Sequence, residues 1–235
     1  MDLQTLQSRV FADIAQFIGN RRGYAFLARA DNMVAVTNGL DHQDHELLQE
    51  SIANRYPVTI SIGIGTGEEP IAALEDATNQ IQTVGSAQDQ SRREVLAGIT
   101  RKRTTSRDVQ IAHFDVNNAT SRYTDQLNAF DSFIVIQRAY ATLMQHLREQ
   151  YSGLSFFVGG DNIISIVPEI TTDDYQEIIQ YVASTAEVNL KVGVGCGSDA
   201  AEAGISAKYA LETCRHREIA IHINDDGVNL SSKEV

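Results

Sequence analysis

An internal repeat is the feature that most constrains what this 235-residue chain can fold into. Residues 24–36 have the same apolar–turn–apolar pattern as residues 154–166, about 130 positions further on. The same shift places the glycine-rich segment 62–67 on 192–197, and no net insertion is needed between the two matches. Since chance does not readily keep two motifs in register over such a distance, the sequence predicts two copies of one fold in tandem.

The turn of the later hairpin carries the first candidate functional residues. Strand-forming residues flank Gly159, Gly160, Asp161 and Asn162 on both sides. The two glycines allow a sharp turn and the close approach of a ligand. Asp161 then lies at the tip, where its carboxylate can face a cation. Taken alone, the pattern also fits an ordinary β-hairpin with an aspartate in its turn, which is the more common case.

An upstream strand carries a second acid. The segment 109–118 has the pattern of a strand that ends at Asp115, followed by Asn117 and Asn118. Two carboxylates from neighbouring strands suit Mg²⁺, a hard cation held by one or two carboxylates together with substrate phosphates. Asp115 and Asp161 are therefore the proposed metal ligands. The alternative is that Asp115 only begins a turn, which aspartate and asparagine favour.

Periodicity and capping signals give both copies the same order of elements. In the second copy we expect strand 109–115, helix 126–150, hairpin 154–167, helix 173–185, strand 188–195 and helix 199–214. In the first copy we expect helix 2–18, hairpin 24–37, helix 41–55, strand 58–65 and helix 70–84, then a polar helix at 90–99. The order β-α-β-β-α-β is the split βαβ, or ferredoxin-like, plan. The predicted fold class is α/β (α+β), with two such domains in tandem and antiparallel sheets.

These elements divide the chain into four predicted segments. They are an N-terminal copy at 1–100, a linker at 101–107, a C-terminal copy at 108–225 and a polar tail at 226–235. Asp115 has no counterpart in the first copy, because a shift of about 130 residues falls before Met1. The first copy therefore lacks its opening strand. Either the two copies have diverged, or the sequence begins downstream of a natural start.

Composition excludes some classes of function. A formal net charge of −12 argues against a general nucleic-acid surface. No apolar run is long enough to span a membrane and no secretory leader opens the chain, so we expect a cytoplasmic protein without a membrane partner. Cys196 and Cys214 do not have the spacing of zinc ligands, which argues against a zinc site.

Several stretches together resemble a known family. A β-α-β-β-α-β unit with an aspartate on its first strand and Gly-Gly-Asp in its hairpin resembles the palm and nucleotidyl-cyclase (GGDEF) catalytic domain. Two such units, with Ala30-Asp31-Asn32 in one and Gly159-Gly160-Asp161-Asn162 in the other, are similar to archaeal GTP cyclohydrolase III. Further similar stretches, which extend the resemblance over nearly the whole chain, are 3–9, 49–57, 85–89 and 110–118.

The resemblance implies a reaction and its cofactors. The family hydrolyses GTP by opening the imidazole ring at C8 with the formyl group retained. The products are 2-amino-5-formylamino-6-(5-phosphoribosylamino)pyrimidin-4(3H)-one and two phosphates, in archaeal flavin and deazaflavin biosynthesis. The resemblance also implies Mg²⁺, as two or more ions, with a monovalent cation such as K⁺ as a further candidate. The expected assembly is a homo-oligomer, either a dimer or a tetramer.

The candidate site combines the residue patterns with this resemblance. Asp115, Asp161 and the Val116 carbonyl are expected to hold Mg²⁺ on the triphosphate, and Asp31 is a further expected metal ligand. Backbone N–H groups at 116–118 are expected to cradle phosphate oxygens. The other expected substrate contacts are Asn117, Asn118, Gly159, Gly160, Asn162 and Lys191 and, from the resemblance alone, Ser86, Gln88 and Asp89.

Three of these side chains have simpler interpretations. Asn117 and Asn118 also fit as caps of the next helix. Lys191 is the one charge in an apolar strand, and it also fits as a side chain that extends to the sheet edge.

His113 alternates with Asp115 along its strand, so the two share a face. It stays outside the predicted catalytic set, because a packed strand histidine is the more common case.

Two other functions stay open on the sequence alone. A GGDEF-like nucleotidyl cyclase would join nucleotides through a 3′-hydroxyl. Such cyclases carry a second acid and an aromatic residue where this turn ends in Asp161-Asn162. A non-catalytic GTP-binding sensor is the other alternative. The absent first strand favours the sensor, and the complete second copy argues against it.

Overall fold

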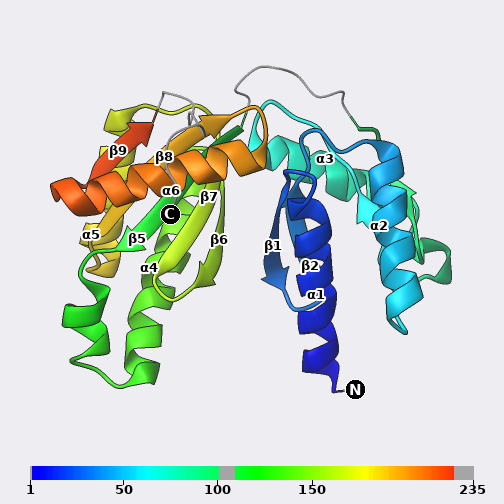
Figure 1. Ribbon diagram of the computed structural model, residues 1–235, viewed down its shortest axis with the longest axis horizontal. Helices are drawn as coiled ribbons and strands as arrows, with labels where there is room; N and C mark the ends of the chain where they lie inside the picture. Colours follow the sequence, from blue (N-terminus) through cyan, green and yellow to red (C-terminus); the bar gives the residue numbers. More distant parts are fainter. Residues whose placement is uncertain (1, 101–108, 225–235) are drawn as a thin grey trace. The chain divides into compact units, whose positions relative to one another are not determined.

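The computed structural model describes residues 2–100 and 109–224 (Figure 1). Contacts divide the chain into two compact units, Met1–Thr105 with Asp199–Ala201, and Ser106–Ser198 with Glu202–Val235. The predicted linker and polar tail lie outside the described residues. Among the described helices, none combines the length and the apolar character needed to cross a membrane.

A five-stranded sheet forms the centre of the second unit, with its strands in the order β6-β7-β5-β8-β9. The strands are β5 (Val109–Val116), β6 (Leu154–Gly159), β7 (Asn162–Val167), β8 (Leu190–Gly197) and β9 (Ile221–Asn224). The first four strands of that order are antiparallel neighbours, and β9 joins β8 in parallel. Strands β5 to β8 thus have the ferredoxin-like order, and the predicted fold class is confirmed.

Three long helices cover the two faces of this sheet (Figure 1). Helices α4 (Ala129–Gln150) and α5 (Thr172–Ala186) pack against each other and against one face. Phe114, Leu143 and Tyr175 are fully buried in the apolar core that forms there. The opposite face carries α6 (Ala200–Arg217). Side chains along a strand point alternately to the two faces of the sheet. The β5 residues between those that enter this core therefore face α6.

Glycines on β8 let α6 approach the sheet closely. A Cβ on Gly193 would lie 2.5 Å from the Ala207 carbonyl oxygen, and one on Gly195 would lie 2.5 Å from the Ala203 carbonyl oxygen. Real Cβ atoms do not come this near to backbone, so a side chain at either position would push the helix away. Lys191 shares this face of β8, which therefore presents a charge directly beneath α6.

The first unit has the same order of elements without a central strand. Its helices are α1 (Leu3–Gly19), α2 (His42–Arg55) and α3 (Pro70–Gln82), and its strands are β1 (Tyr24–Arg29), β2 (Asn32–Val36), β3 (Ile62–Gly63) and β4 (Leu96–Ala97). Strands β1 and β2 form an antiparallel pair, and β3 and β4 form a separate parallel pair. In the second unit β5 bonds to both β7 and β8, whereas no strand within residues 2–100 joins β2 to β3.

The repeat is visible in the packing as well as in the order of elements. A Cβ on Gly67 would lie 2.6 Å from the Ala73 nitrogen of α3. A Cβ on Gly197 would lie 2.6 Å from the Ala203 nitrogen of α6. Both glycines and both alanines are related by the shift of about 130 residues, so the same helix–strand contact is built twice.

Two sequence predictions in the first unit are wrong. The predicted helix at 90–99 is instead a 3₁₀ turn, Gln90–Arg92, followed by β4. Glu94 and Gly98 have φ angles of 55° and 101°, which an α-helix excludes. The predicted strand 58–65 is reduced to Ile62–Gly63, because its ladder partner β4 has two residues.

Candidate active site

One end of the second unit's sheet brings the two predicted metal ligands together. Asp115 on β5 pairs with Asn162 on β7, and Asp161 directly precedes Asn162. The N–H of Val116 donates to the Asp161 carbonyl at 3.3 Å. One pocket of ≈ 380 Å³ at this end of the sheet is lined by Asp115, Val116, residues 118–121, Asp161, Lys191 and Arg215.

The electrostatics of the two carboxylates fit a divalent cation. Burial raises the pKa of the Asp161 carboxyl, and the negative charge of Asp115 raises that pKa further. Each carboxylate disfavours the ionisation of the other. A hard cation, which prefers oxygen ligands, would neutralise both negative charges. Within the described residues, no group of three or more His, Cys, Asp or Glu side chains is placed to hold a metal. Ligands beyond these two carboxylates would therefore come from backbone carbonyls, water or substrate.

Two cationic side chains hold Asp115. Arg215 Nη2 donates to its Oδ1 at 3.0 Å, and Lys191 Nζ lies 3.7 Å from its Oδ2. The Asp115 side chain is 5% exposed and that of Lys191 is 16% exposed, so both charges are largely removed from water. The register of β5 and β8 pairs Asp115 directly with Lys191. Lys191 thus lines the pocket, and its role as a phosphate ligand stays a prediction.

A chain of hydrogen bonds orients Asp161. Asn162 Nδ2 donates to Asp161 Oδ1 at 3.1 Å, and Asn162 Oδ1 lies 2.8 Å from Nε2 of His113. Since an amide oxygen only accepts, His113 donates from Nε2. Burial lowers the pKa of His113, which favours the neutral ring. His113 therefore contacts the site through Asn162, a role that its position on the strand did not reveal.

The turn between β6 and β7 requires its glycines. Gly159 and Gly160 have φ angles of 113° and 63°. Other residues are strained in these conformations, so the turn that presents Asp161 depends on both glycines. A Cβ on Gly159 would meet no atom within 4 Å, which leaves the space beside this backbone open.

The segment after β5 differs from the predicted phosphate cradle. The N–H of Val116 is bonded to the Asp161 carbonyl, and the N–H of Asn117 donates at 2.8 Å to a carbonyl that precedes β8. Two of the three N–H groups expected to bind phosphate are therefore already bonded. Asn117 connects β5 to β8, whereas Asn118, with a φ of 55°, lines the pocket. A π-helical turn, Thr120–Thr124, continues the segment toward α4.

The remaining predicted site residues belong to the first unit. Asp31 is exposed at the turn between β1 and β2, and the next residue, an asparagine, donates to it at 2.8 Å. In the turn after α3, the N–H of Ser86 donates to Asp89 Oδ2 at 2.8 Å, and the N–H of Gln88 lies 3.4 Å from Ser86 Oγ. These side chains are arranged by local turns, and their roles in metal or substrate binding stay predictions.

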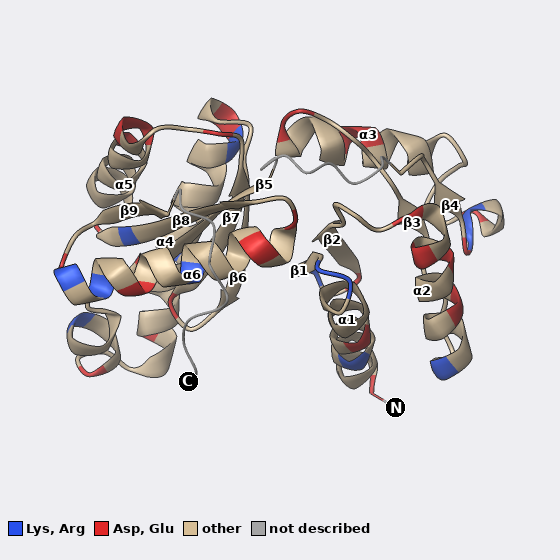
Figure 2. Cartoon of the chain, turned by 45° about the horizontal axis from the view of Figure 1, so that its top comes forward, with Lys and Arg blue, Asp and Glu red and all other residues tan. Residues whose placement is uncertain are grey.

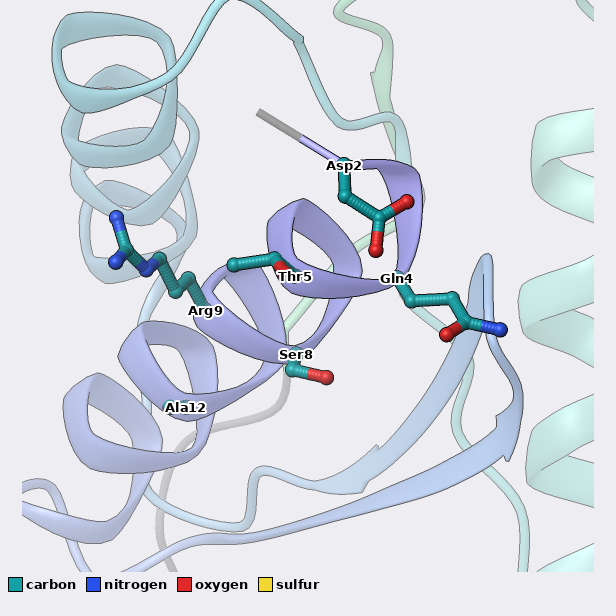
Figure 3. Close-up of a pocket in the computed structure, with 6 residues that line it drawn as sticks. All are labelled: Asp2, Gln4, Thr5, Ser8, Arg9 and Ala12. Atoms are coloured by element: carbon teal, nitrogen blue, oxygen red, sulfur yellow. The ribbon is translucent and has the colours of Figure 1, made fainter.

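A second hollow lies along α1 in the first unit (Figure 3). Its volume is ≈ 390 Å³, and it is lined by Asp2, Gln4, Thr5, Ser8, Arg9 and Ala12. Its lining comes from one helix and the residue before it, and it contains a single carboxylate. With Arg9 as its single cation, it therefore lacks the paired acids and the pair of cations that distinguish the pocket of the second unit.

Sequence reasoning missed Arg215. A basic residue in the last turn of a helix is ordinary, because it complements the helix dipole. The repeat nevertheless contained a signal. A shift of about 130 residues places Lys191 on Ser61 and Arg215 on Gly85, so both cations are specific to the copy that carries Asp115.

The topology and the pocket define a class of protein. The second unit is a palm-like α/β domain that presents a pair of carboxylates beside two cationic side chains, and the first unit is a partial copy of it. A family model described as GTP cyclohydrolase III matches residues 1–227, and this chain belongs to that family.

Relatives support this membership. The chain is 54% identical over 224 residues to "GTP cyclohydrolase III" of Halorubrum lacusprofundi, which covers 95% of this chain and 87% of the relative. It is 58% identical over 217 residues to the protein of the same name from Natronomonas pharaonis, covering 92% of this chain and 86% of the relative. For Methanocaldococcus jannaschii the identity is 39% over 214 residues, covering 91% and 79%.

Two GGDEF domains of known structure are similar to parts of the chain. One, from Pseudomonas aeruginosa, has a TM-score of 0.43 and 15% identity, and covers 51% of this chain and 83% of that chain. The other, from Caulobacter crescentus in complex with c-di-GMP, has a TM-score of 0.41 and 12% identity, and covers 50% of this chain and 76% of that chain.

Proposed function

We propose that this chain hydrolyses GTP, opening the imidazole ring at C8 with the formyl group retained and releasing two phosphates. Three water molecules balance this reaction, since one is added at C8 and one at each of the two cleaved phosphoanhydride bonds. The observation that carries the proposal is the family match over residues 1–227, together with a pocket whose charges suit a metal-bound triphosphate.

The residues of the pocket fit Mg²⁺. Asp115, Asp161 and the Val116 carbonyl would hold the ion, and when bound it supplies neutralisation of the triphosphate charge and polarisation of the phosphorus–oxygen bonds. Burial and the neighbouring charge of Asp115 raise the pKa of Asp161, so a bound cation would stabilise its ionised form. The number of ions and a role for K⁺ stay predictions.

Some side chains of the pocket supply charge, and others orient the carboxylates. Lys191, 3.7 Å from Asp115 Oδ2, provides a positive charge at the pocket wall for phosphate oxygens. The hydrogen bonds from His113 to Asn162 and from Asn162 to Asp161 fix the direction of the second carboxylate. This arrangement preorganises the acidic oxygens before a ligand enters.

The wider setting is proposed from the family alone. It comprises the formylamino-pyrimidine product named above, a place in archaeal flavin and deazaflavin biosynthesis, a homo-oligomer of two or four chains, and a cytoplasmic location.

Product analysis tests the proposed reaction. The purified chain is incubated with GTP and Mg²⁺, and the products are identified by mass spectrometry and a phosphate assay. We expect a formylamino-pyrimidine monophosphate with two phosphates released per GTP. Asp161→Asn should abolish turnover, and Asp173→Asn, which removes an exposed acid on α5, should retain it. A cyclic or dinucleotide product with pyrophosphate, or unchanged GTP, would contradict the proposal.

A further inference from the structure

Arg215 connects two carboxylates at the C-terminal end of α6. Its Nη2 donates to Asp115 Oδ1 at 3.0 Å, and its Nη1 donates to Glu212 Oε1 at 2.6 Å. Figure 2 shows basic segments at this end of the helix. The Arg215 side chain is 39% exposed and lines the same pocket as Asp161 and Lys191. Arg215 is thus held at the pocket by one partner on its own helix and one on the sheet.

The bond to Asp115 competes with the proposed metal. A divalent cation between Asp115 and Asp161 requires carboxylate oxygens, and Arg215 occupies Oδ1 of Asp115 while Lys191 lies near Oδ2. A cation bound there also repels the guanidinium, because like charges a few ångströms apart in a partly buried site are weakly screened. Metal binding therefore weakens the contact between Arg215 and Asp115.

The pocket offers Arg215 a second partner when a nucleotide is present. A guanidinium presents five N–H donors in a planar fork that matches phosphate oxygens. The bond to Glu212, one turn earlier on α6, keeps the group at the pocket while Nη2 changes partner. The triphosphate would then neutralise both the metal and the released guanidinium.

The repeat supports a specific role for this pair of cations. The first copy has Ser61 and Gly85 at the positions of Lys191 and Arg215, and it has no counterpart of Asp115. The two cations are therefore confined to the copy that carries the acid pair and the pocket.

We propose that Arg215 binds the triphosphate of the substrate, exchanging Asp115 for a phosphate oxygen when the metal and nucleotide enter, and that Glu212 is the residue that positions it. This inference rests on the proposed function, because it takes a metal-bound nucleoside triphosphate as the ligand. Arg215 then weakens metal binding in the nucleotide-free protein and strengthens nucleotide binding when the metal is present.

Two binding measurements on the full chain test this exchange. The first is Mn²⁺ affinity without nucleotide, followed by the electron paramagnetic resonance signal of free Mn²⁺. Arg215→Ala should bind Mn²⁺ roughly three- to tenfold more tightly than wild type, because the competing guanidinium is gone. The second is GTP affinity in the presence of Mg²⁺ by calorimetry, which should fall roughly 10- to 100-fold in the same variant.

Controls separate this role from a general loss of charge or structure. GMP affinity should change by much less than GTP affinity, because only the outer phosphates gain the proposed contact. Arg217→Ala removes a charge from the same end of α6, outside the pocket, and should leave both affinities unchanged. Glu212→Ala should weaken GTP binding in the same direction as Arg215→Ala, since the positioning bond from Arg215 to Glu212 is lost.

The outcomes distinguish this inference from the proposed function. If Arg215 only supports the fold, its loss weakens Mn²⁺ and GTP binding together, and the exchange is wrong. The exchange is also wrong if wild type binds and hydrolyses GTP while Arg215→Ala binds GTP equally well. Wild-type protein that binds no GTP with Mg²⁺ would overturn the proposed function and this inference with it.

Discussion

Replacing either carboxylate of the pocket by its amide should abolish metal binding, yet change the stability of the metal-free protein in opposite directions. Asp115 is 5% exposed and bonded to Arg215, with Lys191 3.7 Å away. Asp161 has a carboxyl whose pKa is raised by burial and by Asp115. Asp115→Asn therefore removes the partner of two cations, whereas Asp161→Asn removes a repulsion.

The size of the first effect follows from these contacts. Removing one partner of a buried ion pair costs about 3–5 kcal/mol, because the other charge stays desolvated. Arg215 is 39% exposed and keeps Glu212, so Asp115→Asn belongs at the lower end, near about 3 kcal/mol. For a chain of this size that corresponds to a fall in Tm of roughly 6–12 °C.

The effect of Asp161→Asn depends on pH. Because the folded pKa of Asp161 lies above its unfolded value, the ionised carboxylate lowers the stability of the folded state. This penalty is absent below the unfolded pKa and grows as pH rises through the folded pKa. The Tm of Asp161→Asn should therefore exceed that of wild type at pH 7, and the two Tm values should converge as the pH falls toward 3.8, the ordinary pKa of an aspartate side chain.

Thermal melts with a chelator present, at pH 7 and at lower pH, measure both effects. Added Mg²⁺ should raise the Tm of wild type and leave both variants unchanged. If both variants lose stability to the same extent, the assignment of Asp115 to an ion-pair network and Asp161 to a like-charge position is incorrect.

Three further predictions follow from the packing and hydrogen bonds. Gly195→Ala should lower stability in urea by about 1–3 kcal/mol, since its Cβ would meet the backbone of α6, whereas Gly19→Ala, with no atom within 4 Å, should have little effect. His113→Leu should reduce kcat for GTP with a smaller change in Tm, because the Asn162 side chain loses its hydrogen-bond donor. His113→Gln should recover part of kcat. Equal kcat values for the two variants would argue against a role for this bond. Thr171→Ala should cost about 1 kcal/mol in urea unfolding through loss of the capping box of α5, and an unchanged midpoint would contradict that role.

The sequence predicted the parts of the fold that depend on local pattern. The shift of about 130 residues located both hairpins and both glycine-rich strands, because repeated units preserve turn residues and close contacts. It placed Asp115 and Asp161 at one site because strand–helix–hairpin order fixes which strands are neighbours. The predicted helix at 90–99 failed where Glu94 and Gly98 adopt left-handed backbone conformations that polar composition does not reveal.

The electrostatic partners of the site were harder to predict. Arg215 and Asp115 are 100 residues apart in the sequence. They come into contact because glycines on β8 let α6 pack closely against the sheet. The link from His113 to Asp161 runs through Asn162, so neither residue type nor spacing indicates it. Such contacts depend on tertiary packing, which residue periodicity alone does not determine.

The fate of the C8 carbon of GTP tests the central claim most directly. GTP labelled with ¹³C at C8 is incubated with the chain and Mg²⁺, and the label is followed by NMR. We predict that the imidazole signal is replaced by a formyl carbon that stays attached to the product, while two phosphates are released. Labelled free formate, or an intact imidazole ring in a product formed with release of pyrophosphate, would contradict the account.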